Sequence, residues 1–187
     1  IGNADGDHND IILAEGGDDS ISTGLGTDTT YGGQGDDTVI NAVGTSSSEV
    51  HGDSGDDIVF SGESGNDSIW GDDGDDSLYG GRGAGGYEVY SGANGTDIMY
   101  GGDGNDIVNG GFRGDNTLYG DAGNDSVIGG GDADLLYGGS GDNTVSGGAG
   151  DDSVFVSSGD DSINTGTGTD TVIAGDGNDS ITNASGT

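Results

Sequence analysis

The stretch Gly147-Gly-Ala-Gly-Asp-Asp-Ser-Val-Phe155 decides the fold, because the chain repeats its pattern from one end to the other. The unit is Gly-Gly-x-Gly-x-Asp-x-U-x, in which U is a large aliphatic residue. Close copies begin at Gly32, Gly71 and Gly101. Self-similarity at a short period is typical of a solenoid, in which neighbouring units stack to build one shared core.

The repeat keeps its register along the whole chain. Steps of nine to eleven residues place the sixth position of the unit at nineteen sites between residues 10 and 179. Asp occupies fifteen of these sites, and the exceptions are Ser48, Tyr87, Asn116 and Asn143. Two residues further on, the U position is aliphatic in eighteen units, with Thr30 as the exception. This registration predicts an ordered chain, although the composition alone would favour disorder.

Each unit predicts one short strand and one turn. The x-U-x triplet places U on one face of a strand and its neighbours on the other. The glycines supply the backbone freedom that a tight turn needs. Two units make a coil of about 18 residues, with the U residues of two sheets facing each other. The sequence therefore predicts an all-β parallel β-roll (β-solenoid) of two parallel sheets. We expect a single array over residues 1–187, either a segment of a longer protein or a rod that stacks end to end.

The composition excludes several classes of function. The chain has 187 residues, of which 36 are acidic and only two, Arg82 and Arg113, are Lys or Arg, so its net charge is −34. Such a surface repels nucleic acid, and no apolar run is long enough to span a membrane. The absence of Lys excludes a P-loop, and the absence of Cys excludes disulfides and thiolate chemistry.

The charge and the thin core together call for a cation. Hydrophobic residues make up only 28% of the chain. Sixth-position Asp residues of units i and i+2 should lie one above the other at a coil edge, where their carboxylates would repel. A divalent cation between them, with turn carbonyls, would complete an all-oxygen cage. Ca²⁺ suits this cage because it takes 6–8 oxygens in flexible geometry, whereas Mg²⁺ demands a strict octahedron. Fifth-position Asp and Asn residues are interpreted as solvated turn formers.

The motif resembles the nonapeptide of RTX (repeat-in-toxin) proteins, whose fold is a calcium-loaded parallel β-roll. The resemblance runs from about Asn9 to Ile181. It implies that the calcium ligands, alongside turn carbonyls, are Asp10, Asp19, Asp28, Asp37, Asp57, Asp67, Asp76, Asp97, Asp106, Asp125, Asp134, Asp152, Asp161, Asp170 and Asp179. At Ser48 and Tyr87 calcium is expected to be missing or altered, while Asn116 and Asn143 keep one carbonyl oxygen for weak ligation. The resemblance also implies type I secretion and folding on meeting extracellular calcium.

The ninth position of each unit points outward and carries a file of aromatic residues. In the even-numbered units of this count the file reads Phe60, Tyr79, Tyr100, Tyr119, Tyr137 and Phe155. Three interpretations are open. The rings form a ladder that stacks on itself, or they form a contact surface for another copy or a neighbouring domain, or they form a platform for sugars.

These observations predict a non-enzymatic, calcium-binding structural rod of an extracellular bacterial protein. It would fold on binding calcium and act as a scaffold or fibre at a cell surface or in secreted material. Self-association would use the aromatic file or the open ends of the roll. The alternatives are the C-terminal RTX module of a type I-secreted enzyme or toxin, and a carbohydrate-binding adhesin. No nucleophile elbow or Ser-His-Asp arrangement is present in the sequence.

Overall fold

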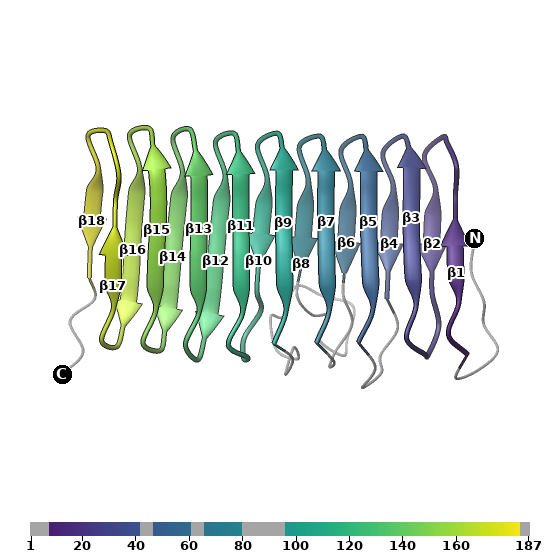
Figure 1. Cartoon of the computed structure of the whole chain (residues 1–187), viewed down its shortest axis with the longest axis horizontal. Coiled ribbons are helices and arrows are strands. Elements are labelled where there is room, and N and C mark those ends of the chain that lie inside the picture. The colour runs from purple at the N-terminus through teal and green to yellow at the C-terminus, as the bar shows by residue number, and fades with distance from the viewer. Residues whose placement is uncertain (1–7, 42–46, 61–65, 80–95, 184–187) are drawn as a thin grey trace.

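The computed structural model describes residues 8–41, 47–60, 66–79 and 96–183. They form two nine-stranded sheets, each made of parallel strands, with one sheet in front of the other. Successive strands of the chain alternate between the two sheets (Figure 1). Equivalent residues in most neighbouring coils are 18 to 20 residues apart. The predicted parallel β-roll is therefore confirmed. Within the described residues, no helix is long and apolar enough to cross a membrane.

Each sheet takes every second strand of the chain. The front sheet contains β1 (Ile11–Leu13), β3 (Thr29–Gln34), β5 (Glu49–Ser54), β7 (Ser68–Asp73), β9 (Ile98–Asp103), β11 (Thr117–Ala122), β13 (Leu135–Ser140), β15 (Ser153–Ser158) and β17 (Thr171–Ile173). The back sheet contains β2 (Ser20–Ser22), β4 (Thr38–Ile40), β6 (Ile58–Phe60), β8 (Ser77–Tyr79), β10 (Ile107–Asn109), β12 (Ser126–Gly131), β14 (Thr144–Ala149), β16 (Ser162–Thr167) and β18 (Ser180–Thr182).

The core consists of the U residues of both sheets. In β11, for example, Leu118 is fully buried while its neighbours Thr117 and Tyr119 are half-exposed. The same alternation repeats in most strands, so that in most of them one apolar side chain fills the space between the sheets, and β15 adds a second, Val156. Thr30 occupies its U position fully buried, and its hydroxyl has no hydrogen-bond partner among the described residues. Ten strands are six residues long, because pairing continues beyond the predicted triplet into the glycine-rich turn.

The register differs from the prediction after residue 79. β7 pairs directly with β9, and β8 pairs directly with β10, so no strand lies between them in either sheet. The predicted unit centred on Tyr87 lies in residues 80–95, outside the described residues, and β9 holds the place beside β7 that was predicted for that unit. Because successive units were predicted to alternate between the sheets, every later unit lies in the sheet opposite to the predicted one. The predicted assignment of units to sheets is correct up to residue 79 and wrong beyond it.

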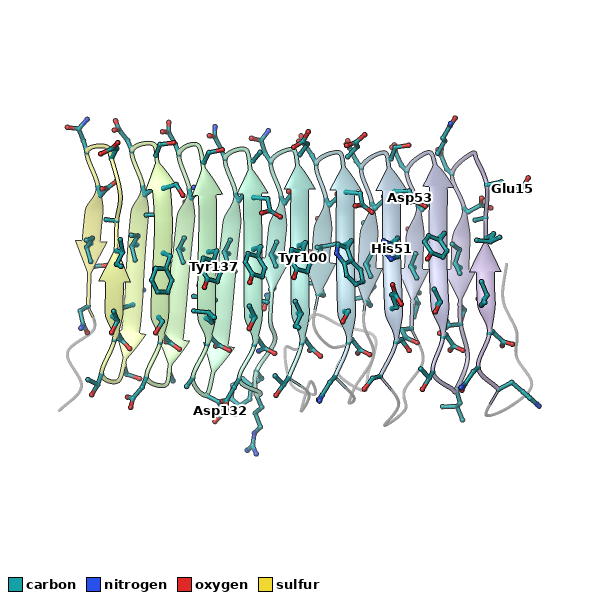
Figure 2. All side chains as sticks on the ribbon, in the orientation of Figure 1. Glu15, His51, Asp53, Tyr100, Asp132 and Tyr137 are labelled. Atoms are coloured by element: carbon teal, nitrogen blue, oxygen red, sulfur yellow. The ribbon has the colours of Figure 1, made fainter. Side chains whose placement is uncertain are left out.

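This shift reorganises the aromatic residues. Phe60 and Tyr79 stack on each other in the back sheet, with ring centroids 5.1 Å apart. The remaining four rings of the predicted file lie in the front sheet, where they continue a ladder that begins earlier in the chain (Figure 2). This aromatic ladder comprises Tyr31, His51, Trp70, Tyr100, Tyr119, Tyr137 and Phe155. The prediction of one file of six rings on one face is wrong.

The aromatic ladder is stacked on itself. Neighbouring rings lie 4.4–5.7 Å apart between centroids and within 19° of parallel. Each inner ring therefore covers both of its faces with its neighbours and turns its edge toward solvent. A sugar platform needs open ring faces, so this geometry favours the interpretation as a self-stacked ladder. His51 fits within it between Tyr31 and Trp70, with Glu49 and Asp72 at 3.3 and 3.5 Å.

The aromatic ladder should contribute measurably to stability. Tyr119 stacks on Tyr100 and Tyr137 at 4.6 and 4.7 Å. Its replacement in Tyr119→Ala removes two stacked contacts and should destabilise the roll by about 2 kcal/mol. Thermal unfolding in saturating calcium measures this change, with Ile128→Ala on the outer face of the back sheet as the control. Equal melting temperatures for the two variants would show that the stack carries no energy of its own.

Candidate metal sites

The sixth-position residues form two columns, one along each edge of the roll. The upper column, in the turns that leave the front sheet, contains Asp19, Asp37, Asp57, Asp76, Asp106, Asp125, Asn143, Asp161 and Asp179. The lower column, in the opposite turns, contains Asp10, Asp28, Ser48, Asp67, Asp97, Asn116, Asp134, Asp152 and Asp170. All fifteen predicted Asp residues thus lie in these columns, although those after Asp76 have exchanged edges relative to the prediction.

Within each column, one carboxylate oxygen is used to join neighbouring coils. The backbone N–H of Asp134 donates to Oδ1 of Asp152 at 2.9 Å, and the N–H of Asp57 donates to Oδ1 of Asp76 at 2.7 Å. The same hydrogen bond recurs at each step of the columns. This anchoring role could not be read from the repeat, which indicates only that carboxylates lie above one another. It fixes each side chain and leaves the second oxygen, Oδ2, for another partner.

That second oxygen has no partner within the protein in ten of the Asp residues. Oδ2 is buried and without a hydrogen bond, among the described residues, in Asp28, Asp37, Asp57, Asp76, Asp106, Asp125, Asp134, Asp152, Asp161 and Asp170. A buried carboxylate oxygen without a partner is costly, since burial removes its hydration. The arrangement is therefore incomplete as a purely polypeptide structure.

In seven of these units the first residue is a glycine that makes room for this oxygen. A Cβ atom placed on Gly129 would lie 2.5 Å from Oδ2 of Asp134 and 2.6 Å from the carbonyl oxygen of Gly147. The carboxylate oxygen and a carbonyl oxygen of the next coil therefore share one cradle, and both are acceptors. Because two acceptors cannot satisfy each other, the cradle calls for a cation or a proton.

The donor set matches calcium rather than a transition metal. The described residues contain no group of three or more His, Cys, Asp or Glu side chains that could hold a metal ion. A cation in these turns would therefore rely on one or two carboxylates and on backbone carbonyl oxygens. Hard, all-oxygen ligation of this kind is what Ca²⁺ accepts. The residues present thus fit calcium, held by sixth-position Asp side chains and turn carbonyls.

The electrostatics of the columns lead to the same requirement. Burial raises the pKa to about 7 for Asp57, Asp76, Asp97, Asp106 and Asp134, and to about 6 for Asp125. The backbone N–H bonded to each carboxylate opposes this rise in pKa, while neighbouring Asp residues add to it in most cases. At neutral pH, without metal, burial therefore disfavours the charged form of these Asp carboxylates.

These raised pKa values predict an unusual pH dependence for the metal-free protein. Between about pH 4 and 7 the folded columns bind more protons than the unfolded chain, so stability falls as the pH rises through this window. In calcium-depleted buffer, lowering the pH from about 8 to about 5 should increase the β-sheet signal in far-ultraviolet circular dichroism. A parallel titration in saturating calcium is the control. A β-sheet signal that stays flat or decreases on acidification of the metal-free protein would contradict the assignment.

The sixth positions that lack Asp differ in which interactions of the Asp side chain they retain. Ser48 retains the link between coils, since its hydroxyl accepts the N–H of Asp28 at 3.3 Å, but it offers no second oxygen. Asn116 and Asn143 keep the link through Oδ1 and turn their Nδ2 into the cradle. Tyr87 lies outside the described residues, so the expectation of altered calcium there stays a prediction.

Fifth-position residues make a separate, exposed ladder of hydrogen bonds. The N–H of Asp56 donates to Oδ1 of Asp36 at 3.0 Å, and the N–H of Asp75 donates to Oδ1 of Asp56 at 2.9 Å. These bonds run toward the N-terminal coil, opposite to those of the sixth position. Fifth-position side chains thus serve the turns, as the sequence predicted.

Comparison with known proteins agrees with this geometry. A family model described as the RTX calcium-binding nonapeptide repeat (4 copies) matches residues 5–39, 44–63, 51–86, 88–112, 111–145 and 146–181. These matches cover well over half of the chain and include both columns. No curated protein matches the chain.

Proposed function

We propose, from the premise that this chain belongs to the RTX calcium-binding nonapeptide repeat family, that it is a calcium-organised rod that acts outside the cell. It is a calcium-binding repeat protein, and RTX repeat proteins are typically secreted by bacteria. In calcium-poor surroundings the chain is unfolded, and in calcium it becomes a rigid spacer or scaffold. Its role is mechanical rather than catalytic.

One observation carries this proposal, namely the ten buried Oδ2 atoms without partners along both edges. A protein whose acidic groups served catalysis would gather a few of them in one cleft. Here they recur along both edges over the described residues, and seven of the ten lie beside the first glycine of a unit in the same kind of cradle. Such regularity supports a structural role for the cation, which supplies the positive charge that the turns lack.

The columns also indicate how the ions would be distributed. Adjacent Asp–Asp pairs number six in the upper column and four in the lower column, ten in all, because Asn143, Ser48 and Asn116 interrupt the series. We expect calcium at these pairs first. The upper edge would then be the more heavily loaded of the two.

Distance measurements between the ends of the roll test the spacer function. Ser22 in β2 and Thr182 in β18 are exposed at opposite ends of the back sheet, and the chain contains no Cys. Fluorescent labels on Ser22→Cys and Thr182→Cys should report one narrow distance of about 38 Å in millimolar calcium, for eight strand spacings. Chelation of calcium should give a longer and broader distribution. A distance that does not respond to calcium would refute the function as a switchable rod.

The same samples test assembly. The outermost strands expose apolar side chains, with Leu13 63% and Ile173 56% exposed. β1 and β17 are also the end strands of the front sheet within the described residues, and open strand edges invite further strands, which supports end-to-end stacking as the route of any self-association. Light scattering in calcium should then detect particles of several rod lengths at high concentration. Scattering from monomers alone would limit the function to a single rod.

A further inference from the structure

The two Asn residues of the columns have a definite orientation. Oδ1 of Asn116 accepts the N–H of Asp97 at 3.0 Å, and Oδ1 of Asn143 accepts the N–H of Asp125 at 3.0 Å. Only the oxygen of an amide can accept a hydrogen bond, so these contacts fix which way each amide faces. The Nδ2 group consequently occupies the place that Oδ2 takes in an Asp-containing turn.

In that place, Nδ2 satisfies the turn carbonyls directly. Nδ2 of Asn116 donates to the carbonyl oxygens of Gly110 and Gly114, at 3.3 and 3.1 Å. Nδ2 of Asn143 donates to the carbonyl oxygen of Gly141 at 3.0 Å. Both Asn side chains are 1% exposed, so these hydrogen bonds are sheltered from water.

The cradle around Nδ2 is the same one that holds the partnerless oxygen elsewhere. A Cβ placed on Gly110 would lie 2.7 Å from Nδ2 of Asn116 and 2.8 Å from the carbonyl oxygen of Gly129. The corresponding distances at Gly129, in the next coil of the lower column, are 2.5 Å to Oδ2 of Asp134 and 2.6 Å to the carbonyl oxygen of Gly147. A donor in one turn thus stands where an acceptor stands in the other.

The charge of the Asn116 turn also indicates a weaker requirement for a cation. Arg113 lies between the two glycines whose carbonyls Asn116 binds, and it is the one Lys or Arg among the described residues. This turn therefore lacks the sixth-position carboxylate of the repeat and gains a positive charge, while Asp115 remains at the fifth position. Both changes reduce its need for a bound cation.

We propose that the turns of Asn116 and Asn143 are closed by their side-chain amides in place of calcium. The two residues lie in neighbouring coils on opposite edges, so they define a metal-free segment within the roll. This segment interrupts both columns of calcium sites, so that the sites before it and the sites after it load separately. The proposal rests on the proposed function, because it concerns where calcium is absent from a calcium-binding roll.

Calcium counting on substituted full-length chains tests this proposal. Asn116→Asp converts the donor into a carboxylate oxygen and creates Asp–Asp pairs with Asp97 and Asp134, so it should add about two bound calcium ions per chain, measured by equilibrium dialysis. Asn143→Asp repeats the test on the upper edge. Asn124→Asp is the matched control, because it adds the same charge at an exposed fifth position and should add no ion.

A second substitution separates the loss of the amide from the gain of a ligand. Asn116→Ala removes the donor without supplying an oxygen, so it should add no ion and should raise the calcium concentration needed for folding. If Asn116→Asp and Asn143→Asp bind no more calcium than the original chain, the amide does not stand in for calcium. If the original chain itself binds no calcium, the proposed function fails instead.

Discussion

Removal of calcium with excess EGTA at neutral pH should abolish the β-sheet signal of this protein. The folded core is thin, with one buried apolar side chain in most strands. Against it stand a net charge of −34 and, in the part of the chain that the structure describes, ten buried carboxylate oxygens without partners. Burying these charged oxygens without a cation raises the free energy of the folded roll. The unfolded chain should therefore be the more stable state once the cations are removed.

Circular dichroism during calcium titration measures this transition. Folding should be cooperative, with a midpoint in the range of extracellular calcium modules, about 10⁻⁴–10⁻³ M. Magnesium at equal concentration is the control and should restore much less structure, because it requires octahedral geometry. A β-rich spectrum that persists in EGTA would mean that the hydrophobic core suffices without metal.

The second large effect concerns the fourth-position glycine of the unit. Gly123 has φ of 146°, and a Cβ at this residue would overlap the carbonyl oxygen of Gly104 in the preceding coil. The substitution Gly123→Ala should therefore push two coils apart and destabilise the roll by about 3 kcal/mol or more. Denaturant unfolding in saturating calcium measures the loss.

Gly17→Ala is the matched control for this substitution. Gly17 also has a positive φ, of 101°, but a Cβ there would meet no atom within 4 Å. It should cost only the conformational strain of a non-glycine residue, about 1 kcal/mol. If the two substitutions cost the same, the coils can separate slightly without loss, and the close stacking of turns is not what limits stability.

Much of the fold could be predicted because the repeat encodes it locally. The U residue of each unit becomes the buried centre of a strand, as Leu118 and Val145 show. The sixth-position Asp residues gather in columns because each coil repeats the same turn. Both properties depend only on the sequence of the unit and on the stacking of each unit on an equivalent unit in the next coil.

The sheet assignment could not be predicted in the same way. Val89 keeps the aliphatic U position, so the unit around Tyr87 still counts as a repeat when the sequence is read alone. Whether a unit enters a sheet depends on its pairing with coils before and after it, and β7 pairs with β9 instead. That pairing places Tyr100, Tyr119, Tyr137 and Phe155 in the front sheet.

The candidate sites show a similar division. The repeat identifies which carboxylates lie at the edges, but it does not say that Oδ1 is used to hold the neighbouring coil. The repeat also does not say whether Asn116 acts as a weak calcium ligand or as a hydrogen-bond donor, because an amide side chain can do either. That distinction depends on which of its atoms accepts the N–H of Asp97.

The direct pairing of β7 with β9 has a consequence for how such a protein evolves. Asp67 contacts Asp97 through the same hydrogen bond that joins other coils, although 30 residues separate them instead of 18 to 20. Coil recognition is thus independent of the length of chain between coils. New sequence can enter at the lower edge, between β8 and β9, without disturbing the rest of the roll. Insertions at this place can therefore accumulate during evolution while the upper turns keep their pattern.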